Sequence, residues 1–310
     1  MPPYAFLRGQ FMPLAEAKVG IMTHALHYGT AAFEGIRGNW NKEKQQVYLF
    51  RAQEHYKRLL NSCRIMKIDL PYSADELCRL TTELVQKSGY REDVYVRPLA
   101  YKSSEVLGVR LHGLEADFSM MVTTFPAYLD DAKGIHVCVS SWKRLEDSMI
   151  PARAKVCGLY VNNALAKTEA IENGYDEAIM LTSSGYVSEG SGENIFLVQD
   201  NTLVTPAASD SILIGITRDT VMQLARNELG IETVQRHIGR SELYLSDECF
   251  LTGTAAHITP VLEIDHRKVG NGKIGEVTGK LRALYFSVIQ GKNEKYLNWC
   301  LPGLPKLVKT

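Results

Sequence analysis

A segment bounded by proline and glycine, PAYLDDAKG at residues 126–134, separates two parts of the chain with different patterns. A proline and a glycine at the ends of such a short stretch are typical of a linker. The chain has 310 residues, and single domains commonly contain about 100 to 200 residues. The sequence therefore predicts a small N-terminal domain over residues 1–126, a linker over 127–134 and a larger C-terminal domain over 135–310.

Before the linker, helical and strand patterns follow one another in blocks. The segment YAFLRGQFMPL predicts a hairpin that turns at Gly9. Ser73 followed by Glu76 is a capping-box pattern, and the leucines after it recur at helical spacing. Residues 56–66 also place their apolar side chains on one helical face. Strands are predicted at residues 47–50, 94–100 and 118–125.

After the linker, short strand patterns predominate, and three helical segments interrupt them. The helices are predicted at 160–173, 217–229 and 275–289, and the strands at 135–142, 177–182, 186–188, 194–199, 202–205, 231–236, 248–252 and 258–264. The segment LPGLPKLVKT at the end of the sequence predicts a loosely held tail. Taken with the α+β pattern of the first part, this alternation predicts an α/β (α+β) fold class.

Charge and cysteine content argue against several classes of protein. Lys plus Arg and Asp plus Glu both number 35, so no global field favours nucleic acid or an anionic membrane. No apolar run approaches the ~20 residues of a membrane span, and the N-terminal residues lack the pattern of a signal peptide. The six cysteines form no C-x-x-C pair and accompany no histidine cluster, so we expect neither a metal site nor disulfides. Reduced thiols in a cytoplasmic protein are the expectation.

Several segments carry residues that could bind an anion, although each has an ordinary alternative. In ILIGITRDTV at 212–221, a glycine and a threonine open a predicted helix, which suits a phosphate or is merely a helix start. LTGTAAHITP at 251–260 could form a second phosphate-binding turn or only end a strand. VSEGSGENIF at 187–196 would alone be a solvated turn. Lys155 and Arg51 would alone be a surface lysine and one charge of a helix face.

Together and in this order, the segments resemble the class IV pyridoxal-phosphate aminotransferases, and within them the branched-chain aminotransferases. The resemblance spans almost the whole chain and lies in HALHYGTAAFEGIR (24–37), LFRAQEHYKRL (49–59), YVRPL (95–99), SSWKR (140–144), IPARAKVCGLYVN (150–162), SEGSGENIF (188–196), GITRD (215–219) and YLSDECFLTGTAAHITPV (244–261). It implies a small N-terminal α/β domain and a larger C-terminal pseudo-barrel domain that flank pyridoxal 5'-phosphate. It also implies a homodimer or a hexamer of dimers.

The resemblance implies a chemical role for each matching residue. Lys155 would be the catalytic residue, which bonds the cofactor and then moves a proton at the substrate α-carbon. Glu189 would keep the cofactor's ring nitrogen protonated, and Tyr160 would hydrogen-bond the ring oxygen. Arg51 would form a bidentate fork with the phosphate. The other implied cofactor contacts are Gly192, Glu193, Asn194, Leu213, Gly215, Ile216, Thr217, Gly253 and Thr254.

The same resemblance divides the substrate-binding residues by the part of the substrate they would contact. The α-carboxylate would be bound by Tyr95 and the backbone of Thr254, Ala255 and Ala256, and the side chain by Phe33, Tyr128 and the partner subunit's Tyr28 and Val109. Arg97 would receive the second carboxylate of glutamate or 2-oxoglutarate. The stretches YVR (95–97) and LGV (107–109) favour the branched-chain group. The implied reaction is transamination between L-leucine, L-isoleucine or L-valine and 2-oxoglutarate, as in amino-acid biosynthesis.

Three alternatives remain open at this stage. A class IV transaminase for D-amino acids or (R)-amines and an aminodeoxychorismate lyase would both share the fold. A non-enzymatic carrier of pyridoxal phosphate is the third, but it would not need the set Lys155, Tyr160, Glu189 and Arg51. At His257 and at residues 157–159 the sequence differs from the residues most common in the family, which leaves the preferred substrate open.

Overall fold

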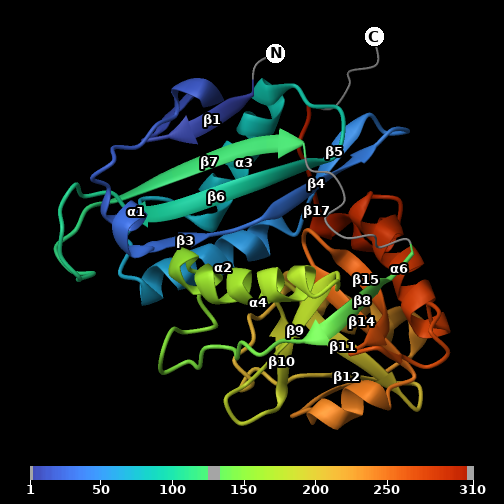
Figure 1. Cartoon of the computed structure of the whole chain (residues 1–310). Helices are drawn as coiled ribbons and strands as arrows, with labels where there is room; N and C mark the ends of the chain where they lie inside the picture. The colour runs from blue at the N-terminus through green and yellow to red at the C-terminus, as the bar shows by residue number, and fades with distance from the viewer. Residues whose placement is uncertain (1–2, 125–132, 306–310) are drawn as a thin grey trace. The chain divides into compact units, whose positions relative to one another are not determined.

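The computed structural model describes residues 3–124 and 133–305, which form two compact units (Figure 1). Unit 1 comprises Met1–Pro126, Ala154–Gly158 and Ser287–Thr310, and unit 2 comprises Ala127–Arg153 and Leu159–Phe286. The predicted domain bounds, 1–126 and 135–310, stay a prediction. An uninterrupted second domain over 135–310 differs from the division into units 1 and 2, because the short segment around Lys155 and the C-terminal residues belong to unit 1. The predicted linker at 127–134 lies mostly outside the described residues.

Unit 1 combines an antiparallel sheet with helices. Its elements are β1 (Tyr4–Leu7), β2 (Gln10–Pro13), α1 (His24–Tyr28), β3 (Ala31–Phe33), β4 (Ile36–Asn41), β5 (Gln46–Phe50), α2 (Ala52–Ile65), α3 (Ala74–Ser88), β6 (Val94–Lys102), β7 (Ala116–Thr124) and β17 (Cys300–Pro302). The strand order is β17-β5-β4-β6-β7-β1-β2, and β3 pairs with β6. The predicted hairpin at Gly9 is confirmed as β1 and β2, which pair in antiparallel register.

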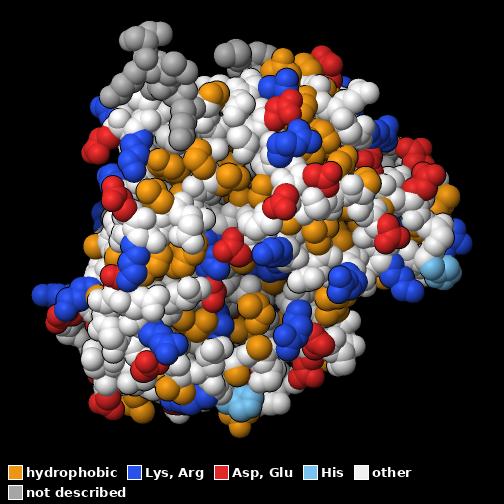
Figure 2. Space-filling model, turned by 180° about the vertical axis from the view of Figure 1, so that it is seen from behind, with side chains coloured by type: hydrophobic (Ala, Val, Ile, Leu, Met, Phe, Trp, Pro, Cys, Tyr) orange, Lys and Arg blue, Asp and Glu red, His pale blue; other side chains and the backbone are white. Residues whose placement is uncertain are grey.

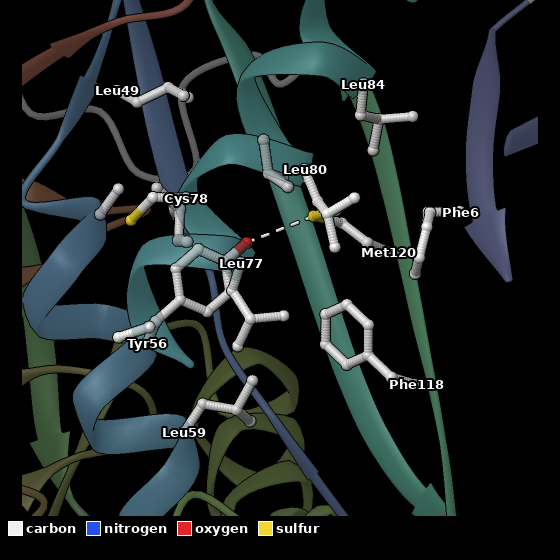
Figure 3. Close-up of a cluster of buried hydrophobic side chains, with 14 of the residues drawn as sticks. Phe6, Leu49, Tyr56, Leu59, Leu77, Cys78, Leu80, Leu84, Phe118 and Met120 are labelled. Atoms are coloured by element: carbon white, nitrogen blue, oxygen red, sulfur yellow. Dashed lines mark hydrogen bonds between the residues drawn. The ribbon is translucent and has the colours of Figure 1, made fainter. Parts of the chain in front are cut away.

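The capping box predicted ahead of α3 is confirmed. The Ser73 hydroxyl accepts the Glu76 N–H, and the Glu76 carboxylate accepts the Ser73 N–H at 2.7 Å. The apolar faces of α2 and α3 then pack against the sheet, as Figure 3 shows for Tyr56, Leu59, Leu77, Leu80, Leu84, Phe118 and Met120. Truncating one fully buried leucine of such a core to alanine costs about 2–5 kcal/mol. This packing fixes the direction in which the opposite face of α2 presents its polar side chains.

The prediction of a loosely held tail is wrong for its first residues. The strand β17 pairs with β5 in the register Cys300↔Phe50, Leu301↔Leu49 and Pro302↔Tyr48. The N–H of Gly303 also donates to the Val47 carbonyl at 2.8 Å. Proline is tolerated here because β17 is the edge strand of the sheet.

Unit 2 is built on a second, mixed sheet. Its elements are β8 (Ile135–Val139), α4 (Tyr160–Glu172), β9 (Glu177–Leu181), β10 (Val187–Gly190), β11 (Asn194–Gln199), β12 (Thr202–Thr205), α5 (Ile216–Leu224), β13 (Thr233–Gln235), β14 (Glu248–Gly253), β15 (His257–Ile264), β16 (Arg267–Lys268) and the beginning of α6 (Glu276–Ile289). The order is β10-β9-β8-β15-β14-β11-β12-β13, with β16 on β15. Parallel pairing joins β8 to β9 and β15, and β12 to β13. The predicted strands at 194–199 and 202–205 are confirmed residue for residue.

Charges of both signs are interspersed on the face of the molecule in Figure 2, as the balanced composition predicts. Between residues 3 and 124 and between 133 and 305, no helix combines the length and apolarity needed to span a bilayer. The mixed sheets with flanking helices confirm the predicted α/β (α+β) fold class.

Candidate active site

Lys155 is fixed in unit 1 by backbone contacts on both of its sides. Its carbonyl accepts the N–H of Phe33, at the end of β3, at 2.9 Å. Its own N–H donates to the Ser62 hydroxyl of α2 at 3.1 Å. The next residue, Val156, forms an isolated bridge with Ala32. The lysine is therefore held between a strand and a helix, and its ammonium lies 4.9 Å from the centroid of the Phe33 ring.

A second cation faces the same aromatic ring. The Arg97 guanidinium on β6 lies 4.7 Å from the Phe33 centroid and 5.2 Å from that of Tyr95. Its Nη2 donates to the Tyr95 hydroxyl at 3.1 Å, and within the described part of the chain its buried Nε has no hydrogen-bond partner. A Cβ at Gly35 would lie 1.9 Å from the Tyr95 hydroxyl, so this approach requires glycine. Two cations beside apolar ring surface suit a ligand that carries both a carboxylate and an apolar part.

Three polar residues beside Lys155 were missed at the sequence level. Glu34 is fully buried and accepts hydrogen bonds from Arg58 at 2.7 and 2.8 Å and from His55 at 2.7 Å. Arg58 lies one helical turn before Ser62, whose hydroxyl donates to the Arg58 carbonyl at 3.0 Å. The only sequence signal for Arg58 was its place in the segment LFRAQEHYKRL, which carries the family resemblance.

Arg51, which the resemblance assigned to the cofactor phosphate, lies at the start of α2. Its Nε donates to Glu54 at 2.9 Å, and its guanidinium lies 5.1 Å from the Trp299 ring. It precedes the first turn of α2, about 16 Å along the helix axis from Ser62. Arg58 lies only about 6 Å from Ser62 along the same axis. This placement favours Arg58 over Arg51 as the cation that acts together with Lys155.

Tyr28 and Val109 lie away from this cluster, on an exposed apolar surface of unit 1. The Tyr28 hydroxyl accepts the N–H of Gly108 at 3.0 Å, and His24 is hydrogen-bonded to the Gly108 carbonyl at 2.8 Å. Val109 is 90% exposed, and Ile21, Leu26, Leu107 and Tyr28 are also exposed. The assignment of Tyr28 and Val109 to a partner subunit's pocket stays a prediction. Tyr128, the remaining predicted side-chain contact, lies outside the described residues.

In unit 2, the carboxylate of Glu189 on β10 is buried among donors. Arg144 contacts its Oε1 at 2.6 Å, and Asn194 Nδ2 and the Leu213 N–H donate to its Oε2 at 2.9 and 3.0 Å. Arg144 also donates to the Ser211 carbonyl and to Asn163. The structure thus brings three predicted residues together and adds Arg144, which the SSWKR segment contained without an assigned role. A buried carboxylate with these donors is stabilised as an anion and suits a cationic ring nitrogen.

Two glycine-containing turns adjoin the beginning of β11. Gly215 is the N-cap of α5, whose first turn contains Ile216 and the buried Thr217, and a Cβ there would lie 2.0 Å from the Asn194 amide oxygen. The second turn joins β14 to β15 through Gly253, Thr254, Ala255 and Ala256. A helix N-terminus and a glycine turn are suitable positions for an anion such as phosphate. Tyr160 is partly buried at the first position of α4.

His257, which differs from the residue most common in the family, belongs to an aromatic cluster. Its ring centroid lies 6.1 Å from that of Tyr285 and 5.0 Å from that of Phe286. Its φ of 54° is in the left-handed region, where it begins β15. These contacts explain its packing and give it no chemical role.

Glu193, which follows Gly192 in the chain, forms an acidic pair with the buried Glu177. Glu177 is bound by Lys167 at 2.7 Å, and Glu193 accepts the Gly192 N–H at 3.0 Å. Burial first, and then repulsion by Glu177, raises the pKa of Glu193 to about 8 from an ordinary value of 4.5. Glu193 therefore keeps its proton to a higher pH in the folded protein than in the unfolded chain.

Replacing Glu193 with glutamine is expected to remove one pH dependence of stability. The folded protein keeps a proton on Glu193 up to pH about 8, which the unfolded chain loses above about 4.5. The proton's contribution to the free energy of unfolding is therefore fully present below the pKa of Glu193 in the unfolded chain. It is lost as pH rises through the pKa of Glu193 in the folded protein. Urea unfolding should show that the wild-type protein loses on the order of a few kcal/mol over this range, and that Glu193→Gln loses less. Parallel pH profiles for the two proteins would contradict this assignment.

Comparison with known proteins agrees with the fold. The family model for amino-transferase class IV matches residues 31–264. The probable branched-chain-amino-acid aminotransferase of Aquifex aeolicus is 51% identical over 303 residues, which cover 98% of this chain and 97% of that protein. The branched-chain-amino-acid aminotransferase of Escherichia coli K12 is 40% identical over 300 residues, covering 96% of each chain.

Solved structures give the same result at the level of the backbone. The branched-chain aminotransferase from Thermoproteus uzoniensis with norvaline has a TM-score of 0.93 and 44% identity, covering 97% of this chain and 99% of that one. The T.th. branched-chain amino acid aminotransferase complexed with N-(5'-phosphopyridoxyl)-L-glutamate has a TM-score of 0.92 and 40% identity, with the same coverage. The chain therefore belongs to the class IV aminotransferases, in the branch of the branched-chain-amino-acid aminotransferases.

Proposed function

We propose that the protein transfers the amino group between L-leucine, L-isoleucine or L-valine and 2-oxoglutarate, with pyridoxal 5'-phosphate as cofactor. The observation that carries this proposal is the cluster in unit 1 where the Lys155 ammonium and the Arg97 guanidinium both face the Phe33 ring. Apolar ring surface accommodates an aliphatic side chain, and a guanidinium beside it accommodates a second carboxylate. The norvaline and phosphopyridoxyl-glutamate bound to the two solved relatives are an aliphatic and an acidic ligand of this kind.

The residues present fit the cofactor in chemical terms. Lys155 supplies the amine to which it would be attached, and Arg58 supplies a guanidinium for its phosphate in place of Arg51. In unit 2, the α5 N-terminus at Gly215–Thr217 and the turn at Thr254 supply further phosphate contacts. The buried Glu189 anion, held at 2.6 Å by Arg144, suits a protonated ring nitrogen. Tyr160 would donate its hydroxyl proton to the ring oxygen.

The bound cofactor supplies an electron sink that stabilises negative charge at the substrate α-carbon. The amine of Lys155 would act as the base that removes the proton from the substrate α-carbon, and its ammonium would return that proton to complete the transfer. The Glu189 carboxylate would hold the proton on the cofactor's ring nitrogen. In unit 1, Tyr95 would hydrogen-bond the substrate α-carboxylate, and in unit 2 the backbone at Thr254–Ala256 would offer further donors to a carboxylate.

Removing the guanidinium of Arg97 is expected to separate the two kinds of substrate. Arg97→Leu should lower kcat/KM for glutamate and 2-oxoglutarate by about 10- to 150-fold, because a charge-assisted hydrogen bond of roughly 1.5 to 3 kcal/mol is lost. The single-turnover half-reaction with L-leucine, followed by cofactor absorbance, should change much less. Arg79→Leu, at an exposed position of α3, is a matched control. Equal losses with both substrates would instead place Arg97 at the α-carboxylate or in the support of the fold.

A steady-state panel tests the proposed reaction against its alternatives. Rates with L-leucine, L-isoleucine and L-valine against 2-oxoglutarate should exceed those with D-alanine and (R)-1-phenylethylamine. Faster turnover of the D-amino acid or the (R)-amine would instead identify a transaminase of the opposite stereochemistry. Release of pyruvate from aminodeoxychorismate would identify a lyase.

We also infer a homodimer or a larger homo-oligomer, and a cytoplasmic location. The exposed apolar surface around Tyr28, Leu107 and Val109 supports the oligomer, because a contiguous surface of this kind is typical of an interface. There the partner subunit's Tyr28 and Val109 would complete the side-chain pocket. All six cysteines are free, which suits a reducing compartment. A monomeric sedimentation coefficient at micromolar concentration would contradict the oligomer.

A further inference from the structure

The carboxylate of Glu34 is the most completely enclosed charge in the cluster around Lys155. Its exposed fraction is 0%, and its two oxygens accept Arg58 Nε at 2.7 Å and Arg58 Nη2 at 2.8 Å. His55 Nδ1 lies 2.7 Å from Oε2. Burial alone would raise the pKa of Glu34. Arg58 and then His55 lower it by a larger amount, so the pKa of Glu34 lies well below its ordinary value. Glu34 is thus stabilised as an anion by the donors around it.

The second partner of Glu34 is an uncharged donor. Burial lowers the pKa of His55, and the charges of Arg58 and Lys155 act in the same direction, against the opposite effect of Glu34. Because the carboxylate can only accept, His55 Nδ1 carries the proton in this hydrogen bond. The cluster therefore contains one buried ion pair, Glu34 with Arg58, and one neutral ring that holds the carboxylate from the side.

Both ends of this ion pair are connected to the backbone of Lys155. Glu34 directly follows Phe33, whose N–H donates to the Lys155 carbonyl at 2.9 Å. Arg58 lies one turn before Ser62, whose hydroxyl donates to the Arg58 carbonyl at 3.0 Å and accepts the Lys155 N–H at 3.1 Å. Lys155, Phe33, Glu34, Arg58 and Ser62 thus form a closed ring of covalent and hydrogen-bonded connections. Such a ring restricts the distance between the Arg58 guanidinium and the lysine.

We propose that Glu34, supported by His55, is a positioning residue that fixes the plane and direction of the Arg58 guanidinium for the cofactor phosphate. A bidentate fork sets the orientation of a guanidinium, and an arginine held in its bound rotamer loses less conformational entropy when the anion arrives. The inference rests on the proposed function, since phosphate binding at Arg58 belongs to it. If Glu34 acted only through its charge, its removal would strengthen phosphate binding, because a buried anion beside Arg58 weakens the attraction of phosphate.

The affinity of the apoprotein for pyridoxal 5'-phosphate relative to pyridoxal isolates the phosphate contribution. Both affinities can be measured by quenching of tryptophan fluorescence, and their ratio should be large for the wild-type protein. In Glu34→Gln, an amide can accept only one of the two Arg58 N–H groups well, so the ratio should fall by about tenfold or more. Glu54→Gln, which alters the ion pair of Arg51 in the same helix, is the matched control and should keep the wild-type ratio.

Further variants keep the test decisive if Glu34→Gln is unstable. His55→Phe is close in size but lacks the Nδ1 donor, and the ratio should fall by a smaller factor of about 3. In an Arg58→Met background, which should itself lower the ratio, Glu34→Gln should add no further loss.

The outcomes separate this inference from the proposed function. An unchanged or larger ratio in Glu34→Gln, or an equal loss of affinity for both ligands, would overturn the positioning role. A wild-type protein that bound neither ligand would instead overturn the proposed function.

Discussion

Lys155→Ala is expected to abolish transamination, with a loss on the order of 10⁴-fold or more in kcat, because one amine both attaches the cofactor and moves the α-proton. Borohydride treatment of the wild-type holoenzyme should fix the cofactor to the peptide that contains Lys155, as mass spectrometry would show. The alanine variant should remain folded, since the backbone of residue 155 makes the contacts to Phe33 and Ser62.

Lys280→Ala, at an exposed position of α6, is the control and should retain both activity and labelling. Cofactor found on a different lysine of the wild-type protein would refute the assignment of Lys155.

Glu189→Gln is expected to slow both half-reactions on the order of 10²-fold, equivalent to a few kcal/mol of barrier. A neutral amide no longer holds the proton on the ring nitrogen, and it leaves the charge of Arg144 buried without its anionic partner. Cofactor should still bind, because the phosphate contacts are unchanged, and stopped-flow absorbance would measure each half-reaction. Glu242→Gln breaks a partly exposed ion pair of the same unit with Arg236 and should leave the rates unchanged. Near-wild-type rates in Glu189→Gln would show that another group holds the ring proton.

The local elements could be predicted because their determinants are close together in the sequence. Ser73 and Glu76 define the start of α3, and short continuous runs of apolar residues define β11 and β12 within a few positions. The edge strand β17 was missed because its Pro302 and the following Gly303 are typical of loops, and only its partner β5 identifies it as a strand. A strand of three residues has no periodicity of its own that could be recognised.

The candidate site was predictable in its residue types but not in its pairings. Arg51 and Arg58 stand in one helix segment, and the sequence does not show which of them lies beside Lys155. That choice depends on which turn of α2 carries Ser62 opposite the lysine, which is set by tertiary packing. Arg144 was likewise overlooked, because 45 positions separate it from Glu189. Residues distant in sequence reveal their electrostatic relationship only when the sheet brings them together.

Unit 1 is assembled from three separate stretches of the chain. Its synthesis therefore begins before that of unit 2, but its fold is completed after that of unit 2. A ribosome would release residues 1–126 first, but β5 would have no partner on its outer edge until residues 300–302 had emerged. Unit 2 needs nothing beyond residue 286 and can close earlier. The nascent chain would therefore carry an open strand edge through most of its translation, a state that favours pairing with other chains. Residues 300–302 would end that exposure, so their loss would affect the yield of folded protein before it affected catalysis.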